Sequence, residues 1–294
     1  MVNAGSVING AFRLVRERPK IFAIWAGLYL VATVAIALVT RPMMSAAMSG
    51  DPSAFGPMFL QMLPMQLTLM LLMLVLFTAA QRAILRPAAD ERFGYLRLGM
   101  DELRTFLLVL IVTVLVYAAM LLFVGISIAL AAALASIAGG AVSAIVSFGI
   151  VFVLIGFFVW LEVRLSLAFP LTLLRRKIII GESWRLTRGR FWTLFGAYLA
   201  LFVILLLVSI IVSAFTAGSY WLDLVRGGFD PAGAQQAAQA QLARQFGPIT
   251  VMTVIGWILG ALSGTLFIAV SGGALATAAR GLAVDTDEIA KTFA

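Results

Sequence analysis

Six long apolar runs, separated by short polar segments, constrain most strongly what this chain can fold into. A transmembrane helix needs about 20 predominantly apolar residues to cross a hydrocarbon core of about 30 Å. With 63% hydrophobic and 12% charged residues and a mean hydropathy of +1.08, the chain lies outside the usual range of soluble domains. We therefore predict an all-α integral membrane protein with six transmembrane helices. The runs cover 21–39, 58–80, 106–138, 141–161, 191–217 and 249–279.

The basic residues are distributed unevenly between the two sides that six crossings define. Both termini fall on one side, together with 18 of the 21 lysine and arginine residues, whereas Arg41, Arg226 and Arg244 fall on the other. Because positively charged segments stay in the cytoplasm, we expect cytoplasmic N- and C-termini. Eighteen arginines against three lysines, in an alanine-rich chain, favour a bacterial gene. The prediction is a multi-pass protein of the bacterial inner (cytoplasmic) membrane.

Three stretches of the chain share one pattern: an aromatic residue or leucine, an Arg-Leu pair, further basic residues, and then a long apolar run. The Arg-Leu pairs begin at Arg13, Arg97 and Arg185, which are 84 and 88 residues apart. This spacing predicts three tandem repeats, each an interfacial amphipathic elbow helix followed by a helical hairpin. We expect one membrane domain, 1–294, with repeats at 5–86, 93–176 and 181–283, an extracytoplasmic insert at 218–247 and a cytoplasmic tail at 284–294.

The first elbow, residues 6–18, has the periodicity of a helix that lies in the membrane interface. Its apolar residues Ile8, Phe12 and Val15 recur at i, i+4 and i+7, and its arginines project to another face. The second and third elbows, 95–104 and 183–190, are shorter. Basic side chains beside an apolar anchor attract anionic headgroups. We therefore predict lipid-headgroup contacts for Arg13, Arg16, Arg97, Arg104, Arg185, Arg188 and Arg190.

Three glycines recur at intervals of four residues in the last apolar run, at Gly256, Gly260 and Gly264. Such a stripe lets helix backbones approach closely, as in small-xxx-small packing of membrane helices. The main interpretation is helix packing within the chain. A homodimer face and a groove for lipid tails are the alternatives.

The third repeat carries the predicted insert. Asp230 followed by Pro231 is typical of an N-cap and a first-turn proline, so we expect a short surface helix there.

The chain has few of the groups that carry enzymatic chemistry. Cysteine and histidine are both absent, which excludes thiol catalysis and imidazole metal ligands. No cluster of metal ligands, nucleophile-base pair or phosphate-binding loop emerges from the sequence, and we expect neither an enzyme nor a cofactor. Ionisable residues are nearly absent from the apolar runs, which disfavours ion-coupled transport.

Two neighbouring stretches, RLSLAFP at 164–170 and ESWRLTRGRFW at 182–192, resemble an uncharacterised family of bacterial six-helix membrane proteins. That family is related to the membrane domain of glycerophosphodiester phosphodiesterases. The resemblance implies six spans with both termini inside. In those phosphodiesterases an attached soluble domain rich in histidine carries the catalysis. This chain has no histidine, and we expect no such domain in it, so the hydrolase activity does not carry over.

The function that we expect from the sequence is that of a non-enzymatic, lipid-interacting scaffold or accessory subunit. The alternative is an ion-uncoupled transporter or flippase for a lipid or an amphipathic small molecule. The expected partners are anionic membrane lipids, with a protein partner or homo-oligomer left open. Nucleic acid is not expected, because the basic excess follows the membrane topology.

Overall fold

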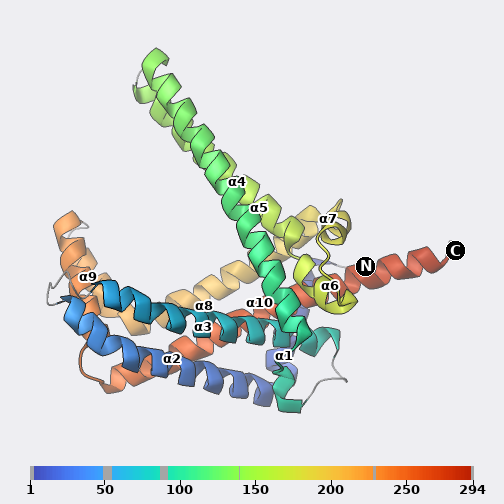
Figure 1. Cartoon of the computed structure of the whole chain (residues 1–294), viewed down its shortest axis with the longest axis horizontal. Helices are drawn as coiled ribbons and strands as arrows, with labels where there is room; N and C mark the ends of the chain where they lie inside the picture. Colours follow the sequence, from blue (N-terminus) through green and yellow to red (C-terminus); the bar gives the residue numbers. More distant parts are fainter. Residues whose placement is uncertain (1–2, 49–54, 87–91, 139, 228–229, 293–294) are drawn as a thin grey trace. The chain divides into compact units, whose positions relative to one another are not determined.

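The computed structural model describes residues 3–48, 55–86, 92–138, 140–227 and 230–292, and all the secondary structure in them is helical (Figure 1). Long apolar helices dominate because a backbone inside a bilayer must satisfy its hydrogen bonds internally. The elements are α1 (Ala4–Glu17), α2 (Pro19–Met48), α3 (Phe55–Leu85), η2 (Arg92–Tyr95), α4 (Met100–Ala138), α5 (Gly140–Leu165), α6 (Ala168–Arg175), α7 (Gly181–Thr187), α8 (Phe191–Arg226), α9 (Pro231–Phe246) and α10 (Val251–Thr292).

Six of these helices are long and apolar enough to cross a membrane, which confirms the predicted number of spans. The third and sixth runs each form one long helix, α4 with 39 residues and α10 with 42. Helix α10 continues without a break into the predicted tail, 284–294, as far as Thr292. The candidate spans are Pro19–Pro42, Met62–Leu85, Met100–Ala133, Phe148–Arg175, Phe191–Arg226 and Val251–Ala283.

The chain divides into two compact units, and their boundaries cut across the predicted repeats. The first unit contains Met1–Val7, Leu98–Gly196 and Leu275–Ala294. In this unit α4 and α5 form a long antiparallel hairpin, and the short helices α6 and α7 pack against its base (Figure 1). Helix α4 ends at Ala138, and α5 begins at Gly140.

The second unit contains Ile8–Arg97 and Ala197–Ala274, and its hydrophobic core joins four helices and η2. Leu14 of α1, Trp25 of α2 and Tyr95 of η2 meet the small residues of α3 and α10 in this core. Because alanine removes side-chain bulk, the helix backbones approach closely there. The α3 and α10 members are Leu76, Ala79, Ala80, Ala83, Ile268 and Ala269.

The closest glycine contacts of α10 lie at the adjacent Gly272 and Gly273, a little over two turns beyond Gly264, the last glycine of the predicted stripe. A Cβ built on Gly272 would lie 2.8 Å from the Cβ of Ala80, and one on Gly273 would lie 2.9 Å from the carbonyl oxygen of Ala11. These two glycines therefore allow α10 to touch α3 on one side and α1 on the other.

The three glycines of the predicted stripe have different surroundings. A Cβ on Gly264 would lie 3.0 Å from the ring of Tyr29, and one on Gly256 would lie 3.6 Å from the methyl group of Thr216. A Cβ on Gly260 would meet nothing within 4 Å among the described residues.

The three predicted elbows differ in structure. The first is the separate helix α1, and the third is α7, which Gly189, at φ +82°, separates from α8. The prediction of a second elbow helix is wrong: η2 is followed by a non-helical segment, 96–99, and α4 begins only at Met100. Gly94 and Tyr95 adopt left-handed φ values of +66° and +65°, which a right-handed helix cannot accommodate.

The insert contains the predicted surface helix, α9. The side chain of Asp230 accepts a hydrogen bond of 2.7 Å from the backbone N–H of Gly233, and Pro231 opens the helix, which confirms the predicted N-cap. The carbonyl oxygens of Gln245 and Gly247, at the other end of α9, accept hydrogen bonds from Arg41 of α2. A cation suits this end because helix C-terminal carbonyls carry partial negative charge.

Candidate functional site

Helix α1 presents its arginines outward because its other face is buried in the protein. The buried stripe is Val7, Ala11 and Leu14, with exposed fractions of 0%, 0% and 3%. The residues expected from the sequence, at positions 8, 12 and 15, flank this stripe and are half-buried. The contact between Gly273 of α10 and the Ala11 backbone sets how closely α1 can approach α10.

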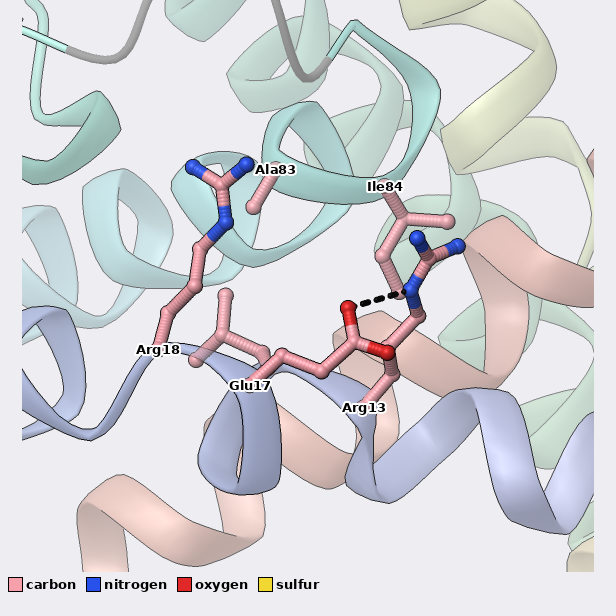
Figure 2. Close-up of a pocket in the computed structure, with 6 residues that line it drawn as sticks. Arg13, Glu17, Arg18, Ala83 and Ile84 are labelled. Carbon is pink, nitrogen blue, oxygen red and sulfur yellow. Dashed lines mark hydrogen bonds and ion pairs between the residues drawn. The ribbon is translucent and has the colours of Figure 1, made fainter.

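The basic end of α1 forms a small pocket with the end of α3 (Figure 2). Arg13, Glu17 and Arg18 line one wall, and Ala83 and Ile84 of α3 line the other. The two guanidinium groups lie on either side of the Glu17 carboxylate, with that of Arg18 near Ala83 and that of Arg13 near Ile84 (Figure 2). The cavity volume is about 30 Å³, which is the room for about one water molecule.

The Glu17 carboxylate is held ionised by its surroundings. Arg13 donates a hydrogen bond of 2.8 Å from its Nε to Glu17 Oε2, and this bond is the main cause that lowers the pKa of Glu17 below its ordinary value. Desolvation is the next largest effect and opposes this lowering, and the charges of Arg13, Arg16 and Arg18 each lower the pKa by a smaller amount. Three arginines and one carboxylate leave this segment with net positive charge.

Arg18 connects this pocket to the core of the second unit. Its Nη1 donates to the hydroxyl group of Tyr95, and its guanidinium lies 5.3 Å from the centre of the Tyr95 ring. Its carbonyl oxygen accepts from the amides of Ile21 and Phe22, so Arg18 also caps the first turn of α2 before Pro19. Arg18 is therefore fixed in place, whereas Arg13 and Arg16 are exposed.

The unusual backbone of Tyr95 is stabilised from several directions. A non-glycine residue at positive φ costs about 1–3 kcal/mol and persists only where its surroundings hold it. The fully buried Arg82 donates a hydrogen bond of 2.7 Å to the Tyr95 carbonyl oxygen, and the indole N–H of Trp25 donates one of 2.9 Å to that of Gly94. These bonds fix the segment that follows α3 against α2.

A second arginine at the end of a span has a similar role within the first unit. Arg164, at the end of α5, donates from Nη1 to the carbonyl oxygen of Trp184 and the hydroxyl of Thr187 in α7, both at 3.4 Å. Its guanidinium lies 5.7 Å from the ring of Trp160 and 5.5 Å from that of Trp184, within the range of cation–π attraction. Ser183 returns a hydrogen bond of 2.7 Å to the Arg164 carbonyl oxygen.

The predicted headgroup arginines occupy two kinds of environment. Arg13 and Arg16 share the exposed side of α1, and Arg185 and Arg188 are exposed on and just after α7. Arg97 is exposed in the segment before α4, whereas Arg104 and Arg190 are half-buried. Arg104 pairs with Asp101 at 3.2 Å.

Three residues of the site were not selected from the sequence. The sequence does not distinguish Arg18, Glu17 or the fully buried Arg82 from the other charged residues near the ends of the apolar runs. Trp25 and Arg82 donate hydrogen bonds to the left-handed pair Gly94 and Tyr95, and Gly94 is the one local signal of that conformation in the sequence. Nothing in the sequence marks Tyr95 as the second member.

The six apolar helices together define a polytopic membrane protein. No protein family, curated protein or solved structure matches this chain. The resemblance to the membrane domain of glycerophosphodiester phosphodiesterases stays a prediction from the sequence.

Proposed function

We propose that this polytopic membrane protein binds anionic lipids at the membrane face shared by its termini and serves as a lipid-interacting scaffold or accessory subunit. The single observation that carries the proposal is α1, whose apolar stripe is buried while Arg13 and Arg16 remain exposed beside the pocket. The proposal includes a bacterial inner membrane with cytoplasmic termini, supported by the 18 basic residues on that side. It also includes the three predicted repeats, each contributing one basic segment.

The size of the pocket defines how a lipid would bind. A cavity of about 30 Å³ is too small to enclose a phosphate group, so the phosphate lies at the rim. Arg13 uses its Nε for Glu17, which leaves both of its terminal nitrogens to donate to phosphate oxygens. Glu17 fixes the Arg13 guanidinium without neutralising the segment, because Arg16 and Arg18 add two further positive charges.

The test is retention of phosphatidylglycerol by the full chain in nanodiscs of mixed phosphatidylglycerol and phosphatidylcholine, measured by native mass spectrometry. A double variant, Arg13→Gln with Arg16→Gln, removes two exposed charges and leaves the contacts of Arg18 intact. At about 1 kcal/mol for each basic residue near an anionic surface, retention should weaken by about thirtyfold. Raising the salt concentration should reduce the difference between wild type and variant.

The matched control is Arg13→Lys with Arg16→Lys, which keeps the charges and removes the planar guanidinium. We expect this control to retain most of the binding if charge dominates, and to lose part of it where paired donors matter. Unchanged phosphatidylglycerol retention in the glutamine variant would contradict the proposal.

A second candidate function, an ion-uncoupled transporter or flippase for a lipid or amphipathic molecule, is favoured by a different observation. Thr78 Oγ1 and Gln81 Nε2 of α3, and Thr265 Oγ1 of α10, are buried within candidate spans without a hydrogen-bond partner among the described residues. Buried polar atoms are usually paired, and water or a polar substrate would pair them.

Thr78→Val with Thr265→Val tests this second function while keeping the side-chain shapes. Movement of a fluorescent phospholipid between the leaflets of reconstituted liposomes should slow in this variant if the hydroxyl groups line a path. Liposomes with wild-type protein that move no more lipid than empty liposomes would rule the transporter out.

A further inference from the structure

Helix α8 bends near its far end, and an open cavity lies along the face of this helix on both sides of the bend. The backbone leaves helical geometry at Ala217, with φ −129° and ψ 18°, directly before Gly218 and Ser219. Glycine and serine are common at helix kinks that lack proline. The cavity has a volume of about 490 Å³ and is lined by one face of α8 from Ser209 to Val225. Small-molecule sites usually measure about 300–1,000 Å³.

The lining of this groove is apolar and open. Ile210, Trp221, Leu222 and Val225 are between 50% and 60% exposed. The indole N–H of Trp221 donates a hydrogen bond of 3.3 Å to Ser213 Oγ. In a straight helix these two residues would be about 12 Å apart along the axis, so the bond bridges the bend and fixes the ring along the groove.

The helix length places the groove at the boundary of the hydrocarbon core. Ala217 follows Phe191 by a helical distance of about 39 Å, which exceeds the thickness of about 30 Å that a span must cross. Tyr220 and Trp221 are adjacent at this level, as aromatic residues are at membrane interfaces. Asp223, beyond the bend, pairs with Arg244 of the polar helix α9 at 3.1 Å. The groove thus opens where acyl chains meet headgroups, on the membrane face opposite the termini.

One arginine at the end of this groove is available to a ligand. Arg226 directly follows the last lining residue, is exposed, and makes no hydrogen bond or ion pair within the described part of the chain. The other two basic residues of this face are engaged: Arg41 with the carbonyl oxygens at the end of α9, and Arg244 with Asp223 and Ser219.

We infer that the α8 groove binds one acyl chain of a phospholipid from the leaflet opposite the termini, with its phosphate group paired to Arg226. An apolar groove at the acyl boundary followed by a cation at headgroup level matches the chemistry of a phospholipid in that order. This site shares no residue with the α1 pocket, and its existence does not depend on the function proposed for that pocket.

The experiment uses the full chain in phosphatidylcholine nanodiscs that contain a small fraction of phospholipid with a diazirine in its acyl chain. A parallel sample contains the diacylglycerol with the same chains, which lacks the phosphate. After irradiation, mass spectrometry maps the labelled residues. We expect phospholipid labels to concentrate within 209–225, and diacylglycerol labels to be several times weaker there.

Three variants separate the parts of this inference. Ala214→Phe fills the groove at an exposed position and should reduce labelling of 209–225 at least fivefold. Ile211→Phe, less than one turn away and outside the lining, should leave it unchanged. Arg226→Gln should lower phospholipid labelling to the diacylglycerol level.

Several results would overturn the inference. These are labelling spread evenly over the exposed faces of α8, equal labelling by phospholipid and diacylglycerol, or a dimer in native mass spectrometry that Ala214→Phe dissociates. The last result would assign the groove to a second copy of the chain. Arg13→Gln with Arg16→Gln should not change labelling of 209–225, so failure of the α1 proposal and failure of this one are distinguishable.

Discussion

Replacement of Gly273 by alanine tests whether α1 is held close to α10 by the backbone contact at this glycine. A Cβ at this position would lie 2.9 Å from the Ala11 carbonyl oxygen and 3.3 Å from the Ala11 Cα. Both are backbone atoms, so no side-chain rotation can relieve the clash, and α1 must move away. Inserting one methyl group into a close-packed contact costs about 1–3 kcal/mol.

The matched control is Gly260→Ala on the same helix, where an added Cβ meets nothing within 4 Å among the described residues. Glycine to alanine in a helix interior also raises helix propensity by up to about 1 kcal/mol, and this gain is common to both variants. The difference between the two variants therefore isolates the packing cost. We expect Gly273→Ala to be less stable than Gly260→Ala by about 1–3 kcal/mol.

The assay is reversible unfolding by sodium dodecyl sulfate in mixed micelles, followed by tryptophan fluorescence, with amide hydrogen exchange of α1 as a second measurement. Because each 1.4 kcal/mol is a factor of about ten, exchange within α1 should become about 5- to 150-fold faster in Gly273→Ala than in the control. Equal unfolding free energies for the two variants, with equal exchange in α1, would refute the packing argument.

Contacts of single side chains lead to four more expected outcomes. Arg13→Gln should raise the pKa of Glu17, since the Arg13 hydrogen bond is the main cause that lowers it, and a carbon-13 NMR titration that shows no change would contradict this. Because the folded-state pKa of Glu17 is lowered, its carboxylate stabilises the folded protein fully above the unfolded-state pKa, and this stabilisation is lost as the pH falls through the folded-state pKa. Glu17→Gln should therefore make the unfolding free energy depend less on pH in this acidic range. Trp25→Phe leaves the buried Gly94 carbonyl without its 2.9 Å hydrogen bond and should lower the unfolding free energy by about 1–3 kcal/mol. An unchanged unfolding free energy in the detergent titration would contradict this expectation. Asp230→Ala removes the N-cap of α9 and should destabilise that helix by about 1 kcal/mol, seen as faster exchange in its first turn, with Asp230→Asn as the conservative control.

The sequence correctly predicted the elements that depend on residues close together in the chain. The six spans follow from bilayer thickness, and the α9 cap follows from an Asp-Pro pair. Gly189 lies at positive φ at the bend between α7 and α8, where the sequence places the end of the third elbow.

Long-range contacts determined which face of α1 is buried and where the second elbow departs from a helix, and periodicity alone does not predict either feature. In α1 the apolar positions occupy two adjacent stripes, and periodicity selects Phe12 and its neighbours as readily as Ala11 and its neighbours. The fully buried stripe is the one with Ala11, because Gly273 lets the α1 backbone approach there. The second elbow has the same sequence pattern as the first, but bonds from Arg82 and Trp25 hold its start in a left-handed conformation.

The sequence by itself determined that this is a six-span helical membrane protein, because apolar length and backbone hydrogen bonding inside a bilayer leave no other choice. It also determined which residues are basic, but not what each one does. Tertiary structure decided that Arg82 is buried on a backbone carbonyl, that Arg164 lies within 6 Å of two indole rings, and that Arg13 is exposed beside a carboxylate. The physical reason is that an arginine's role depends on the acceptors and rings that other helices bring to it, and residues distant in the chain supply them.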